Sequence, residues 1–109
     1  MESKSKKIKN YIRKDGKSPF EEWFSRLRDN AVKARILTRI DRVRFGNFGD
    51  CKSVGDGVFE LRIHFGSGYR VYFGLVGTEV VLLLGGGEKS SQPKDITNCQ
   101  EYWREYKNG

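Results

Sequence analysis

The sequence predicts an α+β domain, in which an N-terminal strand and a helical hairpin pack on an antiparallel β-sheet and a C-terminal helix follows. Three observations predict this class. Helix-capping residues and apolar residues at helical spacing occupy positions 18–46. Alternating apolar residues between short glycine turns occupy positions 58–85, and helical spacing returns between 95 and 106. Because the 109 residues contain no linker or repeat, one domain spanning 1–109 is expected.

The N-terminal half is expected to form one strand and two helices. Weak alternation in Lys6–Arg13 indicates the strand. Ser18 then begins a helix as its N-cap, with a proline at the first helical position. Asn30 can cap a second helix, and Gly46 is placed to end it. The short connection predicts that the two helices are antiparallel.

The C-terminal half is expected to form a meander closed by a helix. Cys51–Val54 is either a short strand or a tether, and three strands follow at about 58–65, 69–76 and 79–85. The run Gly85–Gly87 is expected to end the last strand. The closing helix is expected over Asp95–Tyr106, with Asp95 as its N-cap.

The segment ELRIHFGSGYRVYF, residues 60–73, reads as a hairpin. A three-residue turn at 66–68 places Phe65 opposite Tyr69. Because side chains alternate along a strand, one face is apolar and the other gathers polar side chains. This second set, here called the polar patch, consists of Glu60, Arg62, His64, Arg70 and Tyr72.

The last strand is expected to follow a two-residue turn at 77–78, which sets Arg70 opposite Gly85. The same turn places Val81 and Leu83 on the face of the polar patch. The alternate residues, Val80, Leu82 and Leu84, then join the core. The closing helix is expected to cover the apolar part of the second face.

The charge balance indicates an anionic partner. The chain has 21 Lys and Arg against 14 Asp and Glu, a formal net charge of +7. Most of the cations lie in Met1–Lys17 and Arg26–Arg44, which are either solvated basic surfaces or a surface for nucleic acid. The RNA-binding candidates are Tyr72, Lys33, Arg35, Arg39, Arg42 and Lys52.

Several classes of protein are not indicated. Cys51 and Cys99 have neither metal-ligand spacing nor the pattern of a disulfide framework, so a reducing cytoplasm is expected. His64 is the single histidine, and no metal or cofactor is expected. No apolar stretch approaches a membrane span. The segment LLLGGGEKSSQPKDI lacks the spacing of a nucleotide-binding phosphate loop.

The polar patch has the composition of a phosphodiester site. Arginine binds phosphate oxygens in a bidentate manner. Cleavage of RNA requires a base, an acid and cations for the developing charge. Histidine is the side chain that normally titrates near neutrality, so His64 is a candidate base or acid, and Glu60 either serves as a base or only pairs with Arg62. The catalytic candidates are Arg62, His64, Arg70, Lys89 and Glu60, while Tyr72 can stack on a nucleobase. An ordinary exposed sheet face is the alternative.

The motifs SPFEEWFSRLRD, GNFGDCKSVGDGVFELRIHFGSGYRVYF and LLLGGGEKSSQPKDI resemble, in this order, the RelE/ParE superfamily of toxins from type II toxin–antitoxin modules. The resemblance covers nearly the whole chain and is greatest to the HigB-related branch called addiction module killer proteins. It implies a RelE-like fold and a cytoplasmic toxin held inactive by an antitoxin. That antitoxin is usually a helix-turn-helix protein. The toxin is expected to contact operator DNA only through this antitoxin.

The resemblance also implies an activity. Well-studied RelE-like members are mRNA interferases that cut mRNA in the ribosomal A site without metal. Arg70, in GYR, matches the sheet arginine of the superfamily, and Arg62 and His64 fall where RelE-like members have lysines. Lys89 falls near a basic residue after the last strand, but the C-terminal catalytic tyrosine of some members has no clear counterpart near Asp95.

We therefore expect a ribosome-dependent mRNA endonuclease that inhibits translation and growth. Its basic helix and N-terminal tail are expected to dock on ribosomal RNA. Two alternatives remain open. A ParE-like toxin binds DNA gyrase without a nuclease site, and an inactive relic keeps only RNA or antitoxin binding.

Overall fold

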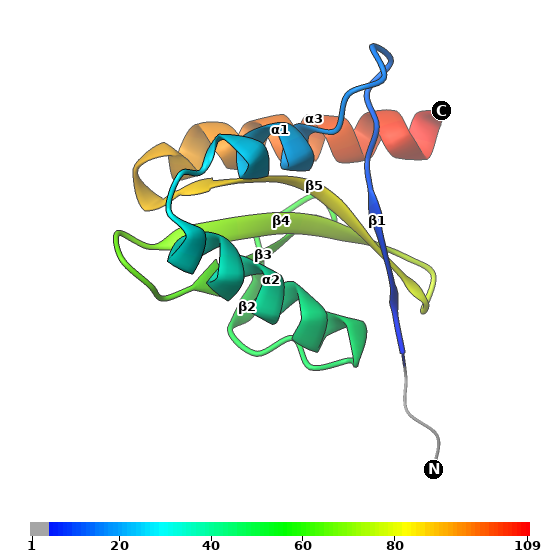
Figure 1. The fold of residues 1–109 in the computed structure, drawn as a ribbon. Helices are drawn as coiled ribbons and strands as arrows, with labels where there is room; N and C mark the ends of the chain where they lie inside the picture. The colour runs from blue at the N-terminus through cyan, green and yellow to red at the C-terminus, as the bar shows by residue number, and fades with distance from the viewer. Residues whose placement is uncertain (1–4) are drawn as a thin grey trace.

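The computed structural model describes residues 5–109, so Lys4 of the basic N-terminal segment lies outside the described residues. The elements follow the expected order (Figure 1). They are β1 (Lys7–Asn10), α1 (Pro19–Arg26), α2 (Asn30–Arg44), β2 (Cys51–Ser53), β3 (Phe59–Ile63), β4 (Tyr69–Val76), β5 (Val80–Glu88), a 3-10 turn (Lys89–Ser91) and α3 (Gln92–Asn108). The α+β class is confirmed, and the segment at 51–53 is a strand rather than a tether.

The strands form one five-stranded sheet in the order β1-β5-β4-β3-β2. Strands β2 to β5 make the expected antiparallel meander. β1 extends the sheet beside β5 in parallel, with Lys7 opposite Val80. A parallel pair needs a long connection, and here α1, α2 and the rest of the meander lie between the two strands in the chain.

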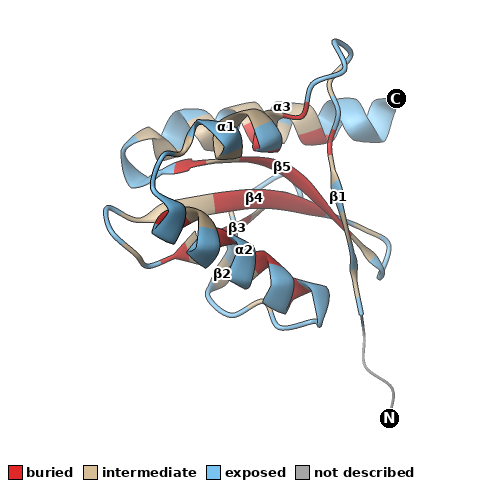
Figure 2. Ribbon diagram, viewed as in Figure 1, coloured by how far each residue is buried: buried red, intermediate tan, exposed pale blue. Residues whose placement is uncertain are grey.

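The sheet separates two cores, and Figure 2 shows much of the central strands β4 and β5 buried between helices. On one face, α1 and α2 cover a cluster whose strand residues are Leu61, Ile63, Val71, Phe73, Val81 and Leu83. On the other face, α3 covers a second cluster, formed by Tyr11, Val58, Tyr72, Leu82, Leu84, Cys99 and Trp103. The expected assignment of β5 side chains to the two faces of the sheet is therefore wrong, because each set lies on the face predicted for the other. Val81 and Leu83 pack under the helical hairpin, and Leu82 and Leu84 pack under α3.

The register of the β3–β4 hairpin also differs from the expected one. Ile63, not Phe65, lies opposite Tyr69, so the connection spans 64–68 and the pairing is shifted by two residues. A shift of two leaves every side chain on its original face, because the side-chain period of a strand is two. Arg62 and Arg70 therefore still share a face, and they now lie directly opposite each other.

The expected turn at 77–78 is wrong as well. Val76 pairs with Val80 across residues 77–79, and the register shifts again at a β-bulge further along the pair. These two changes place Arg70 opposite Gly87 rather than Gly85.

The run Gly85–Gly87 lies inside β5, so the expectation that it ends the strand is wrong. These glycines instead allow side chains of the helices to approach the strand closely. A Cβ at Gly86 would lie 2.2 Å from the ring of Trp23 of α1. A Cβ at Gly87 would lie 1.9 Å from the carboxylate of Asp95 of α3. Helices therefore press against the backbone of β5 from both faces of the sheet.

The helix starts decide what lies near the polar patch. Ser18 caps α1 as expected, because its Oγ accepts a hydrogen bond from the backbone N–H of Glu21. The cap of α2 is Asp29 rather than Asn30. α3 begins at Gln92, so Asp95 lies in its first turn and is not its N-cap. Because α3 begins earlier than expected, its first residue, Gln92, contacts Glu60 of β3 and so reaches the polar patch.

Candidate functional site

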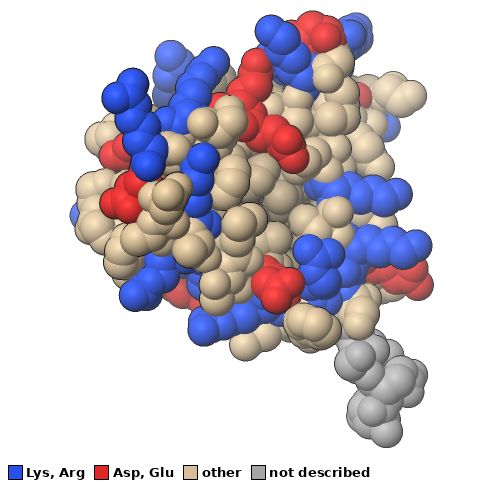
Figure 3. Space-filling view, viewed as in Figure 1, with Lys and Arg blue, Asp and Glu red and all other residues tan. Residues whose placement is uncertain are grey.

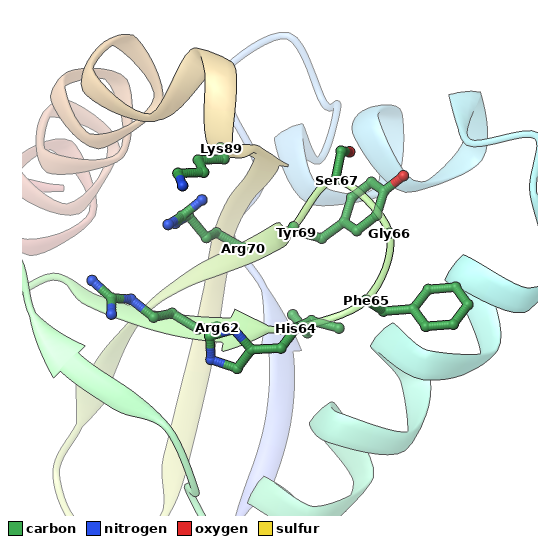
Figure 4. Close-up of a pocket in the computed structure, with 10 residues that line it drawn as sticks. Arg62, His64, Phe65, Gly66, Ser67, Tyr69, Arg70 and Lys89 are labelled. Atoms are coloured by element: carbon green, nitrogen blue, oxygen red, sulfur yellow. The ribbon is translucent and has the colours of Figure 1, made fainter.

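A groove of about 510 Å³ opens beside the connection between β3 and β4. Arg62, His64, Arg70 and Lys89 line it, and none of its lining residues, all within the described range, carries a carboxylate. Figure 4 shows the head groups of Arg62, Arg70 and Lys89 directed toward the same open space. This groove, here called the cation groove, brings together four of the side chains predicted to act on a phosphodiester.

Arg62 and Arg70 face each other across β3 and β4, which places two like charges side by side. Glu60 offsets this repulsion from behind. Nε of Arg62 donates a hydrogen bond to Oε1 of Glu60 at 3.0 Å. Nε of Arg70 lies 3.3 Å from Oε2 of Glu60 without the alignment of a hydrogen bond. Among the described residues these contacts engage only the Nε atoms, so the terminal nitrogens of both guanidinium groups are available for a bidentate ligand.

Glu60 itself is fully buried, so the expectation that it stands on an open face is wrong. Nε2 of Gln92, at the start of α3, donates a hydrogen bond to Oε2 of Glu60 at 2.7 Å. Partners from β3, β4 and α3 thus enclose one carboxylate. A carboxylate enclosed in this way does not reach a substrate in the groove. Of the two roles expected for Glu60, the structure shows the ion pair with Arg62. The carboxylate is therefore placed to position the guanidinium groups of Arg62 and Arg70.

Tyr72 is also fully buried, and its expected role in stacking on a nucleobase is wrong in this structure. It belongs to the cluster under α3, and burial raises the pKa of its hydroxyl. A different aromatic residue lines the cation groove. Tyr69, the first residue of β4, is partly exposed there. Alternation along the strand predicted that Tyr69 lies on the core face. Because Tyr69 is the first residue of β4, it lies at the edge of the cluster that α1 and α2 cover and is only partly buried.

His64 lies in the loop directly after β3, and its side chain is 72% exposed. Its Nε2 contacts Oδ2 of Asp50, and this hydrogen bond lowers the pKa of the Asp50 carboxyl. The contact holds the imidazole at the edge of the cation groove, and Nδ1 has no hydrogen bond among residues 5–109. The sequence offered no signal for Asp50, because it precedes β2 and lies outside every periodic segment.

The arginines of α2 divide into two groups. Arg39 donates hydrogen bonds of 3.1–3.3 Å to carbonyl oxygens of Phe48, Asp50 and Arg62, so it fastens α2 to β3 and to the loop before β2. Arg35 lies over the ring of Phe65, with 4.6 Å between its Cζ and the ring centroid. Arg42 is exposed, and no hydrogen bond or ion pair of its side chain occurs among residues 5–109. The fourth arginine of α2, Arg44, pairs with Asp41, so Arg35 and Arg42 are the α2 arginines whose side chains have no hydrogen bond or ion pair among residues 5–109.

The other predicted RNA-binding residues lie farther out. Nζ of Lys33 lies 5.4 Å from the ring centroid of Phe24 of α1, and Lys52 is exposed on β2. Neither lines the cation groove. Figure 3 shows Lys and Arg side chains along the lower edge of this view, over α2, and at the right beside β1. The basic surface therefore extends beyond the groove.

The start of α3 contributes two residues with different roles. Gln92, which sequence reasoning missed, joins the site through Glu60. Asp95 lines a separate cleft of about 150 Å³ between α1 and α3, where it accepts a 2.5 Å hydrogen bond from Oγ of Ser91. The start of α3 was placed three residues too late, so neither contact could be inferred.

Two general properties complete the description of residues 5–109. No group of three or more His, Cys, Asp and Glu side chains in this range is arranged to hold a metal ion. None of the helices in this range has both the length and the apolar character that a membrane span requires.

No family model matches the chain. A protein of Haemophilus influenzae, described only as uncharacterized, is 56% identical to it over 81 residues. The matched region covers 74% of this chain and 82% of the Haemophilus influenzae protein. The chain therefore belongs to the same family as that protein. Because the description names no activity, the function must be argued from the groove.

Proposed function

We propose that this protein is the toxin of a type II toxin–antitoxin module and that it cleaves mRNA on the ribosome. The observation that carries the proposal is the convergence of Arg62, Arg70, Lys89 and His64 on the cation groove. Two arginine forks and a lysine match a phosphodiester, and the groove falls in the range of about 300–1,000 Å³ typical of ligand sites. The resemblance of the sequence to the RelE/ParE superfamily supplies the biological setting.

The groove contains the groups that cleavage requires. The 2′-oxygen of the RNA attacks the adjacent phosphorus, and the bond to the 5′-oxygen breaks. This leaves a 2′,3′-cyclic phosphate and a 5′-hydroxyl. His64 accepts the proton of the 2′-hydroxyl, and Lys89 or water supplies a proton to the 5′-oxygen. Arg62 and Arg70 stabilise the charge that develops on the phosphate oxygens, and Glu60 holds both arginines in place.

The module implies two kinds of partner. The first is the ribosome with its mRNA, toward which the net charge of +7 favours association. The second is a cognate antitoxin, a helix-turn-helix protein that would mask the groove and link the pair to operator DNA. The proposed location of all of these is the cytoplasm.

The proposal is tested by inducing the protein in growing bacteria and mapping mRNA ends by primer extension. The wild type is expected to arrest growth and to produce new cleavages in the ribosomal A site. Arg62→Ala/Arg70→Ala is expected to abolish both effects. The control Arg104→Ala/Lys107→Ala removes the same charge from exposed positions of α3, outside the groove and outside the basic N-terminal tail and α2, and it is expected to remain toxic.

Because the double alanine leaves buried Glu60 without its two cationic partners and with only the hydrogen bond from Gln92, a second variant separates loss of function from loss of fold. Lys89 has no ion pair among the described residues, so Lys89→Ala keeps the Glu60 contacts and is expected to weaken cleavage with an unchanged circular dichroism spectrum. A fully toxic double alanine would rule out this site. DNA breaks with intact mRNA would point instead to gyrase, and the absence of any growth arrest to an inactive relic.

A further inference from the structure

A second groove of about 300 Å³ adjoins the cation groove on the side of α2. Arg62, His64 and Phe65 line both grooves, so the two form one continuous depression with His64 at their junction. We call the second one the α2 groove. Its far wall is formed by α2, from which Arg35 and Arg42 line it.

The α2 groove offers different chemistry from the cation groove. Arg39 forms a fixed part of its wall, since its guanidinium is hydrogen-bonded to three backbone carbonyl oxygens. Arg42 supplies an exposed cation. Arg35 lies over the ring of Phe65 as a cation–π pair, and guanidinium and aromatic planes are the surfaces on which nucleobases stack. Figure 4 shows the ring of Phe65 directed toward α2.

The one carboxylate among the lining residues of the α2 groove does not oppose an anionic ligand strongly. Asp50 contacts Nε2 of His64, and its pKa is lowered by that hydrogen bond. The nearby positive charges of Arg62 and Arg39 also favour the charged form of Asp50 and offset part of its negative charge. The groove therefore combines a phosphate-binding cation, a stacking surface and a locally compensated carboxylate. This combination fits a nucleotide better than an isolated phosphate.

We propose that the α2 groove is a nucleotide subsite, which binds the nucleotide adjacent to the phosphate held in the cation groove. A single RNA strand then passes from Lys89 and Arg70, across His64, to Arg42. The base of the adjacent nucleotide packs on the Arg35–Phe65 pair, and Arg42 binds the next phosphate. This inference rests on the proposed function. It assigns Arg35 and Arg42 to the substrate strand rather than to the surface of ribosomal RNA.

The test measures binding of a fluorescein-labelled 2′-O-methyl RNA tetranucleotide by fluorescence anisotropy at several salt concentrations. Methylation of the 2′-oxygen prevents cleavage, so binding is observed alone. Inorganic phosphate, which we expect to bind where Arg62, Arg70 and Lys89 converge in the cation groove, is followed separately through the imidazole resonances of His64, the single histidine of the chain. Arg42→Ala is compared with Arg28→Ala, an exposed arginine that lines neither groove.

Arg42→Ala is expected to weaken tetranucleotide binding about fivefold to tenfold and to reduce the salt slope by about one phosphate contact. Its affinity for inorganic phosphate is expected to equal that of the wild type. Arg28→Ala is expected to change neither. Unchanged tetranucleotide affinity and salt slope in Arg42→Ala would overturn the proposal.

Lys89→Ala separates this inference from the proposed function. Weaker binding of both phosphate and tetranucleotide in Lys89→Ala supports a strand that occupies both grooves. If Lys89→Ala binds both probes normally while Arg42→Ala loses the tetranucleotide, the proposed role of the cation groove fails. The α2 groove would then remain a nucleotide subsite.

Discussion

The face of the sheet that α3 covers contains two regions with opposite properties. Under the body of α3, Tyr72, Leu82 and Trp103 are buried. Beyond the first turn of α3, Arg62 of β3 and Arg70 of β4 lie on the same face of the sheet. Their side chains are 29% and 12% exposed and line an open groove. Tyr72 and Arg70 are only two residues apart on β4. The pattern of a strand assigns both to one face, and the end of a helix decides which is core and which is site.

The border between the two regions lies at Glu60. On the adjacent strand β4, Glu60 is paired with the buried Tyr72, and its side chain contacts the arginines of the groove. Gln92 of α3 completes the enclosure. The buried region thus supports the open one, because the helix that covers the core also fixes the carboxylate that positions the cations.

The largest effect is expected from the covered region. Trp103→Ala removes a ring that packs so closely on β4 that a Cβ at Gly74 would lie 2.5 Å from it. The free energy of unfolding is expected to fall by about 3–5 kcal/mol, measured by urea denaturation. Tyr106, which stacks on Trp103 but is 42% exposed, is the control, and Tyr106→Ala is expected to cost much less. Equal losses in the two variants would contradict the division into a covered and an open region.

A smaller effect is expected at the border. Glu60→Ala leaves Arg62 and Arg70 opposed without their shared carboxylate, and is expected to lower the free energy of unfolding by about 2–3 kcal/mol. Glu60→Gln keeps an acceptor oxygen and is expected to lose about half as much stability, while still weakening binding of inorganic phosphate. Glu101→Ala, which removes an exposed glutamate of α3, is the control. If Glu60→Ala behaved like Glu101→Ala in unfolding and in phosphate binding, Glu60 would not position the arginines.

The smallest effect is expected from Asp95→Asn. Burial raises the pKa of the Asp95 carboxyl above its ordinary value of 3.8, so the folded state favours the protonated form. The stability associated with that proton is present at low pH and is lost as pH rises through the raised pKa. Asp95→Asn removes this dependence. Its stability relative to the wild type is expected to rise between pH 3 and pH 7, by no more than about 1 kcal/mol. A constant difference across this range would contradict a raised pKa.

The residues that local chemistry controls were predictable from the sequence. Ser18 caps α1, and the alternation of β3 and β4 places Arg62 and Arg70 on one face. That placement holds even though the register was wrong by two residues, because a shift of two preserves the face of each side chain. The membership of Arg62, Arg70, Lys89 and His64 in one groove depends on these local patterns together with the position of the turn.

Other features were decided by tertiary structure alone. The burial of Glu60 and Tyr72 follows from where α3 begins and how it lies on the sheet, which no strand pattern contains. Gly85–Gly87 continue β5 because Trp23 and Asp95, from two different helices, need the space that a Cβ would fill. Asp50 reaches His64 because the pairing of β2 with β3 brings the residue before β2 close to the residue after β3, and Asp50 itself belongs to no periodic segment. Local periodicity therefore determined which side chains of β3 and β4 share a face, and only the packing of helices on that face determined which of them are exposed to a ligand.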